Sequence, residues 1–268
     1  MSFTKTLTSK KKPIAQIGLI SAGTVYSLLG LLVFMAAFNI NGRSPSETDQ
    51  KEVFDFVLGQ PGGKILLGAL AMGLICYALW RCIQTFADTR HDGSGLKGYA
   101  LRARYLFAGL VYGSLALVAI NILISPSLSG SENRNEKIAK ELLSRPFGQW
   151  LIGIAGAIFL GIGLFEIYFA LSNNFKNLVK KISQSRHQQI LETAGKIGYI
   201  ARGFVWLVIS WFFFQAAIHS RSSKAGDMAE VFSFLDNIAY GNYLLAAVGL
   251  GLICFGTFNF IRAKYERL

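Results

Sequence analysis

The chain has 268 residues, of which 52% are apolar and only 16% charged, and its formal net charge is +12. Four long stretches contain no Lys, Arg, Asp or Glu: residues 13–40, 147–165, 203–220 and 237–261. A membrane-spanning helix needs roughly 20 apolar residues to cross a hydrocarbon layer about 30 Å thick, whereas a helix of a soluble core seldom stays apolar on every face. The composition therefore excludes an ordinary soluble domain and predicts a membrane protein.

The chain begins with a polar segment that ends in Lys10-Lys11-Lys12. The apolar run that follows is longer than the core of a cleaved signal peptide, so we expect a retained first helix. Hydrophobicity then predicts six spans in order, over about residues 14–39, 64–86, 103–125, 148–172, 197–219 and 242–262.

The connections between the spans differ in character. Amphipathic segments at Glu52–Leu58 and Met228–Leu235 predict short helices at the membrane interface. The connection between the third and fourth spans contains a charged stretch, Glu132–Arg145. The remaining two connections, 87–99 and 173–195, are polar and are expected to be loops.

The chain contains an internal repeat. Gly73–Tyr77 returns as Gly251–Phe255, and Glu52–Phe56 returns at the same shift of 178 residues as Glu230–Phe234. A third copy lies between these two, because glycines align in all three copies. In the first helix of each copy these are Gly23, Gly109 and Gly203, and at the start of each second helix they are Gly63, Gly148 and Gly241. Two matches in one register and a nearly constant period indicate a duplicated helical hairpin.

We therefore predict one all-α, polytopic membrane domain with six transmembrane helices in three tandem repeats, over about residues 13–97, 98–190 and 191–268. Each copy crosses the membrane twice, so all copies point the same way and their pseudo-threefold axis lies along the membrane normal. The side with both termini carries sixteen basic and four acidic residues, against about eight and ten on the other. The positive-inside rule predicts cytoplasmic termini in a cell membrane and short amphipathic helices in the non-cytoplasmic connections.

Small residues are expected at helix contacts. Ala69-x-x-x-Gly73 recurs in register as Ala247-x-x-x-Gly251, and spacing by four places both residues on one helix face. The aligned glycines of the first helices are also candidates for close packing: Gly23, Gly109 and Gly203. General enrichment of glycine in membrane helices is the alternative explanation for any single pair.

Ionisable side chains at membrane depth are costly and are therefore candidate functional residues. Arg81 and Glu166 occupy the same repeat position in two spans, and Asn259 is the third equivalent. We predict a polar ring near the cytoplasmic side, in which Arg81 and Glu166 could pair. The ring is either a gate or solute-binding site, or a structural ion pair with an arginine that reaches the headgroups.

A second polar level is expected near the outer helix ends, at Asn39, Ser125 and His219. His219 is predicted to lie at the membrane interface, where water solvates its ring. Arg202 is expected to anchor to headgroups, with an anion contact as the alternative. Aligned aromatic residues in the first helices are expected to pack rather than to form a ligand cage: Tyr26, Tyr112 and Trp206.

No motif for enzyme chemistry stands out. The three histidines lack metal-ligand spacing, and neither a glycine-rich phosphate loop nor a Gly-x-Ser-x-Gly elbow is present. The three cysteines fit neither a zinc site nor a disulfide framework, and we expect small buried side chains at Cys76, Cys82 and Cys254. We predict no enzyme activity, no catalytic residue, no metal and no cofactor.

Two of the first helices open with the pattern Ile-Gly-x-x-x-x-Gly-x-x-aromatic, at Ile17–Tyr26 and Ile197–Trp206. With three tandem two-helix units, this pattern resembles the prokaryotic membrane family filed as domain of unknown function 1206. The first copy has Ala22 at the position that Arg202 occupies in the third copy. The second copy has Arg104 where the glycine of Ile-Gly would stand. The resemblance implies a six-helix integral membrane protein of a prokaryote and brings no activity or catalytic residue.

Three functions remain open from the sequence. A transporter or channel for a small solute or ion is favoured by threefold repetition with charged groups at matching depth. A structural or partner-binding membrane protein with a sealed interior is the alternative, and a lipid-modifying enzyme would need a polar cluster at a lateral cleft. The expected partners are the bilayer, anionic lipid at the cytoplasmic face and a second copy of the chain; the absence of a nucleic-acid reader motif argues against DNA or RNA.

Overall fold

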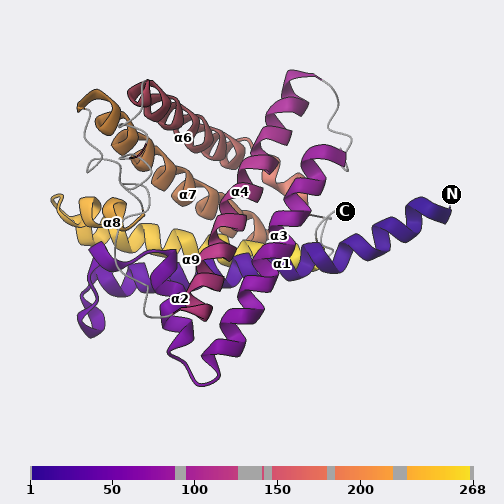
Figure 1. The fold of residues 1–268 in the computed structure, drawn as a ribbon, viewed down its shortest axis with the longest axis horizontal. Coiled ribbons are helices and arrows are strands. Elements are labelled where there is room, and N and C mark those ends of the chain that lie inside the picture. Colours follow the sequence, from indigo (N-terminus) through magenta and orange to yellow (C-terminus); the bar gives the residue numbers. More distant parts are fainter. Residues whose placement is uncertain are drawn as a thin grey trace.

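The computed structural model describes residues 2–87, 95–125, 141, 147–179, 185–219 and 228–265, which are almost entirely helical. Six of the described helices are long (Figure 1): α1 (Ser2–Ala37), α3 (Gly63–Ala87), α4 (Leu96–Ile124), α6 (Gly148–Leu171), α7 (Ser185–His219) and α9 (Gly241–Tyr265). Each contains a segment long and apolar enough to cross a membrane. The predicted all-α fold with six spans is confirmed.

Shorter helices connect the long ones: η1 (Ile40–Gly42), η2 (Pro45–Glu47), α2 (Gln50–Leu58), η4 (Asn174–Leu178) and α8 (Met228–Asp236). The two amphipathic segments of the sequence form α2 and α8, which bury their apolar faces against the long helices. The side chain of Asp49 caps α2 by accepting a hydrogen bond from the backbone N–H of Glu52 at 2.8 Å. The charged stretch Glu132–Arg145, apart from Glu141, lies outside the described residues.

Two connections predicted to be loops are partly helical. Helix α4 already begins at Leu96, and α7 begins at Ser185, which lies ten residues before Gly195. Residues 185–194 include no Gly or Pro, and polar residues do not end a helix whose surface is exposed to water. Hydrophobicity located the apolar part of each helix and missed its polar extension.

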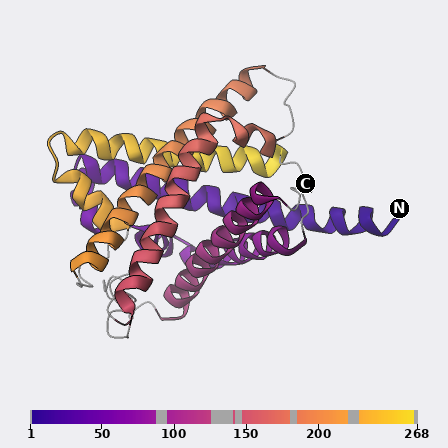
Figure 2. The same cartoon turned by 90° about the horizontal axis from the view of Figure 1, so that it is seen from above.

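The closest helix pairs join neighbouring repeats rather than the two helices of one repeat. α3 packs against α4, α6 against α7, and α9 returns to α1 (Figures 1 and 2). The contacts of α1 with α3 and of α7 with α9 link these three pairs. Three aligned glycines lie in the contacts within the pairs. A Cβ added to Gly23 would lie 3.0 Å from the carbonyl oxygen of Gly256, and one added to Gly203 would lie 3.0 Å from that of Gly163. Gly109 faces α3 more loosely, with its nearest neighbours at 3.4 Å.

Within a repeat, close contact depends on glycine in the first and third copies. A Cβ on Gly18 would lie 2.7 Å from the Cα of Tyr77, and one on Gly198 would lie 2.5 Å from the Cα of Phe255. These approaches hold α1 against α3 and α7 against α9. The second copy has Arg104 at this position, and no comparable contact can form.

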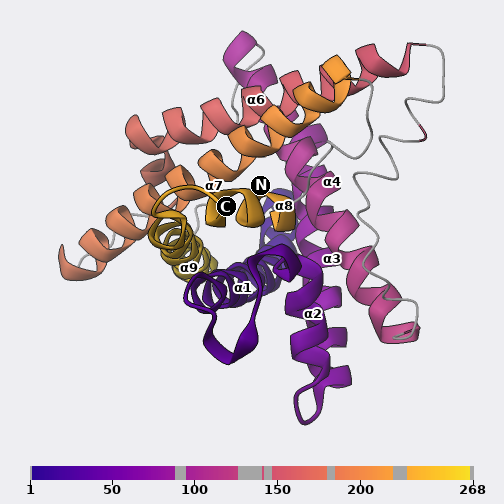
Figure 3. The same ribbon diagram turned by 90° about the vertical axis from the view of Figure 1, so that its left-hand side faces the viewer.

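A second contact point is lost in the same copy. Gly73 packs against Ser21, and its counterpart Gly251 packs against Ala201. The equivalent pair in the second copy is Ile158 and Phe107, two bulky residues. Accordingly the backbones of α4 and α6 come close at few points, and Figure 3 shows the two helices crossing rather than running side by side. Side chains bridge them instead, as where the ring centroids of Phe107 and Phe159 lie 6.1 Å apart. The ring of helices is therefore symmetric in its order and open at one side.

Candidate functional site

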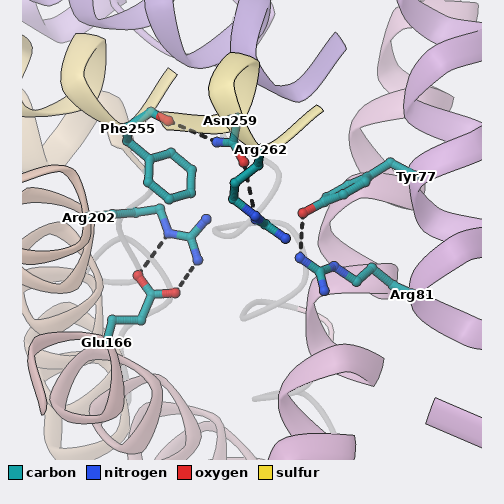
Figure 4. Close-up of polar contacts among 7 residues, drawn as sticks. All are labelled: Tyr77, Arg81, Glu166, Arg202, Phe255, Asn259 and Arg262. Atoms are coloured by element: carbon teal, nitrogen blue, oxygen red, sulfur yellow. Dashed lines mark hydrogen bonds and ion pairs between the residues drawn. The ribbon is translucent and has the colours of Figure 1, made fainter. Parts of the chain in front are cut away.

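A cavity of about 320 Å³ lies at the centre of the bundle and is lined by residues from all six long helices. Its charged lining among the described residues comprises four arginines and one glutamate: Arg81, Arg104, Arg202, Arg262 and Glu166. Tyrosine and phenylalanine rings fill the spaces between them. Figure 4 shows most of this cluster, with Arg81 on one side, Arg202 and Glu166 on the other and Arg262 between them.

Glu166 of α6 forms an ion pair with Arg202 of α7. Arg202 donates Nε to one carboxylate oxygen at 2.8 Å and a second N–H to the other oxygen, which is a bidentate geometry. The two side chains are only 3% and 12% exposed. The predicted partner of Glu166 was Arg81, and α7 instead supplies a nearer guanidinium because α6 packs directly against α7.

The expectation that Arg202 anchors to headgroups is wrong. Its guanidinium is turned into the bundle, where it lies 4.3 Å above the ring centroid of Phe255 as well as beside Glu166. Pairing and stacking replace the water that an arginine loses on burial. The sequence placed Arg202 near a helix start, but the polar extension of α7 moves that start far from the residue.

Arg81 points into the cavity from α3 and is 7% exposed. It donates hydrogen bonds to the hydroxyl oxygen of Tyr77 at 2.5 Å and to the amide oxygen of Gln84 at 2.8 Å. Its guanidinium also lies 5.4 Å from the ring centroid of Tyr105. These groups come from α3 and α4 and fix the position of the charge.

The third member of the predicted ring has a different environment. Asn259 is fully buried, donates to the carbonyl oxygen of Phe255 at 2.9 Å and accepts a hydrogen bond from Arg262 at 3.3 Å. Arg262, one helical turn further along α9, is the residue that lines the cavity. The structure therefore brings Arg81 and Glu166 to one cavity. Asn259 instead orients Arg262, an arginine that the sequence analysis does not single out.

Arg104 is the other residue that sequence reasoning missed as a site. It enters from α4 and lies over the rings of Phe169, Phe165 and Tyr199, at 4.3, 5.3 and 5.6 Å from their centroids. Among the described residues no carboxylate forms an ion pair with it. The signal in the sequence was its position, because an arginine stands where the two other copies have the packing glycines Gly18 and Gly198.

Aromatic residues connect the arginines. The ring of Tyr112 meets Tyr77 edge to face at 4.4 Å and Tyr26 at 6.4 Å. Trp206 also lines the cavity, and its indole N–H has no acceptor among the described residues. The aligned aromatics Tyr26, Tyr112 and Trp206 thus all border the cavity, in addition to packing against their neighbours.

The cluster lies inside the apolar part of the helices, near the side with both termini. Arg81 is five residues before Phe86 and Glu166 is five before Leu171, where their candidate spans end. That separation is about 7 Å along a helix axis. At this depth a charge needs a partner or a ligand, so the arrangement is suited to binding an anion.

The predicted outer polar level does not form a site with these residues. Asn39 is exposed just after α1 and has a left-handed backbone conformation with φ of 49°. His219 is exposed at the end of α7, with its Nδ1 3.0 Å from the carbonyl oxygen of Gln215. Neither lines the central cavity.

Comparison with known proteins agrees with this architecture. The chain is 26% identical over 261 residues to the "Uncharacterized protein YxxB" of Bacillus subtilis (strain 168), covering 96% of this chain and 92% of that protein. No solved structure matches. The profile of one family matches three times, over residues 17–88, 103–173 and 197–266, once in each repeat. Because these matches span most of the sequence, the chain belongs to the family described as Domain of Unknown Function (DUF1206).

Proposed function

We propose that this multi-pass membrane protein binds an anionic solute in its central cavity and moves it across the membrane. The observation that carries the proposal is the charge of the cavity, where four arginines face one glutamate among the described lining residues. Glu166 is already engaged by Arg202. A negatively charged ligand matches the guanidinium group of Arg104 in charge and in hydrogen-bond geometry.

Arg104 is central to the proposal. Among the described residues, its guanidinium is held by aromatic rings and by no carboxylate, so binding an anion breaks no ion pair there. Cation–π contacts leave the N–H groups at the edge of the guanidinium available for hydrogen bonds. The indole N–H of Trp206 is a further donor that a ligand in the cavity can satisfy.

For localisation we propose the cell membrane of a prokaryote, with both termini in the cytoplasm. The excess of basic residues on the side of the termini supports this orientation. The cavity then lies nearer the cytoplasmic face, because Arg81 and Glu166 are close to the helix ends on that side. Reporter fusions to each terminus test the orientation, and a periplasmic signal from either fusion contradicts it.

The function is tested with the purified chain in phosphatidylcholine vesicles and two anionic probes. Uptake of inorganic phosphate follows a soluble anion, and dithionite quenching of a labelled phosphatidic acid follows a lipid anion between leaflets. We expect at least one probe to move faster than in empty vesicles and Arg104→Ala to reduce that rate roughly tenfold, as expected for the loss of one charge-assisted contact.

Arg102→Ala is the matched control, because Arg102 lies two residues away on α4 and does not line the cavity. It should keep the rate within about twofold of the wild type, since about 0.4 kcal/mol separates rates that differ by a factor of two. Equal rates for the wild type, Arg104→Ala and empty vesicles with both probes would overturn the proposal.

A further inference from the structure

We infer that the cavity has a lateral entrance between α4 and α6 and that its ligand is an amphiphilic anion, a phosphate head with an apolar tail, drawn from the bilayer. The inference rests on the proposed function and specifies its substrate class. It starts from the gap in the ring of described helices, between the two helices of the second repeat, whose backbones come close at few points.

The cavity extends to the lipid-facing surface at this place. Ile158 and Gly161 of α6 line the cavity and are nevertheless exposed, Ile158 by 51%. A Cβ built on Gly161 meets no atom within 4 Å, so open space lies in front of it. On the opposite helix the exposed Ala103 also belongs to the lining. The same residues therefore face both the cavity and the surface that the bilayer covers.

The entrance is apolar except for one charge. Phe107 and Val111 continue the lining on α4, opposite Ile158. Arg104 lies one turn from Phe107, and its guanidinium is directed over Phe165 and Phe169 of α6. A tail-bearing anion placed here contacts hydrocarbon side chains along its tail and a guanidinium at its head. A fully hydrated anion gains only the second contact.

The dimensions agree with a head group rather than a whole lipid. A cavity of about 320 Å³ is at the lower end of roughly 300–1,000 Å³ for small-molecule sites. Acyl chains would therefore remain in the bilayer outside the entrance, next to the exposed side chain of Ile158. The occupant is a headgroup phosphate that is drawn inward between α4 and α6.

Gly161→Trp tests the entrance without touching any arginine. A Cβ at Gly161 meets open space, so we expect the variant to fold normally and its indole to occupy the gap between the helices. Leu164→Trp is the control, because Leu164 is 54% exposed on the same helix and does not line the cavity. The full chain is equilibrated in vesicles of phosphatidylcholine with phosphatidic acid, extracted in mild detergent and examined by native mass spectrometry for retained lipid.

We expect the wild type and Leu164→Trp to retain phosphatidic acid in preference to phosphatidylcholine. The amount of phosphatidic acid retained by Gly161→Trp and by Arg104→Ala should be roughly tenfold lower than in the wild type. If only Arg104→Ala lowers retention and inorganic phosphate displaces the lipid, the anion enters from water. That result overturns the lateral entrance and leaves the proposed anion function intact. Equal retention of both lipids by every variant would overturn the binding of a lipid anion altogether.

Discussion

Arg202 of α7 holds both carboxylate oxygens of Glu166 of α6, and both residues are almost completely removed from solvent. The pair joins the end of the second repeat to the start of the third at the depth of the apolar core. It also engages the described acidic group that lines the cavity, so Glu166 does not neutralise Arg104.

Breaking this pair should destabilise the protein strongly. In Glu166→Gln the Arg202 guanidinium stays buried without its counter-charge, which typically costs about 3–5 kcal/mol. Replacing both partners with leucine should recover most of that loss, because no uncompensated charge remains. Thermal unfolding in detergent measures both effects, and a single variant as stable as the wild type would contradict this account of the pair.

Glycine contacts within the first and third repeats should tolerate no side chain. Gly198→Ala places a methyl group 2.5 Å from the Cα of Phe255, and overpacking of this kind costs about 1–3 kcal/mol. Gly161→Ala, which meets open space, should be neutral or stabilising by up to about 1 kcal/mol because alanine is the better helix former. Unfolding temperatures of the two variants provide the comparison, and equal values would be inconsistent with it.

The splaying of α4 and α6 should be reversible by substitution. A triple variant, Arg104→Gly with Phe107→Ser and Ile158→Gly, gives the second repeat the small contact residues of the first. We expect α4 and α6 to move together, which spin labels at Leu106 and Leu160 would report as a shorter distance. The three native cysteines are replaced beforehand, because all are free thiols. An unchanged distance would assign the splaying to another cause.

Low pH should stabilise the docking of α2. Burial raises the pKa of Asp49 above its ordinary value, although the backbone N–H of Glu52 opposes this. A carboxyl with a higher pKa in the folded state contributes stability that is fully present below its unfolded pKa of about 4 and is lost as pH rises through the raised value. Acidification from neutral pH should therefore favour the fold.

Asp49→Asn isolates this contribution. It removes the titrating group and keeps an oxygen acceptor for the cap. The wild type should gain more stability than the variant between pH 7 and pH 4.5, as measured by the difference in unfolding temperature. Parallel pH profiles of the two proteins would show that Asp49 does not titrate differently on folding.

Local features of the sequence determined the fold class. Apolar runs of sufficient length must form helices in a bilayer, because lipid cannot satisfy backbone hydrogen bonds. The repeat was readable because equivalent glycines keep their spacing, and the amphipathic segments before α3 and α9 carried their own helical period. The depth of a residue in the membrane could also be predicted, because it follows from the position of the residue along its span. This identified Arg81 and Glu166 as candidate functional residues.

The tertiary structure alone decided which helices are neighbours and what the charged residues contact. Whether two helices pack together depends on whether their backbones can approach, and that is a property of both segments. Glu166 of α6 therefore forms its ion pair with Arg202 of α7 rather than with Arg81, its counterpart in the first repeat. Arg104 appeared in the sequence as a departure from a glycine pattern. Only the packing of six helices showed that Arg104 lies where α4 and α6 separate and that it places a charge in the opening. A bulky side chain at a contact position must either be excluded or separate the helices.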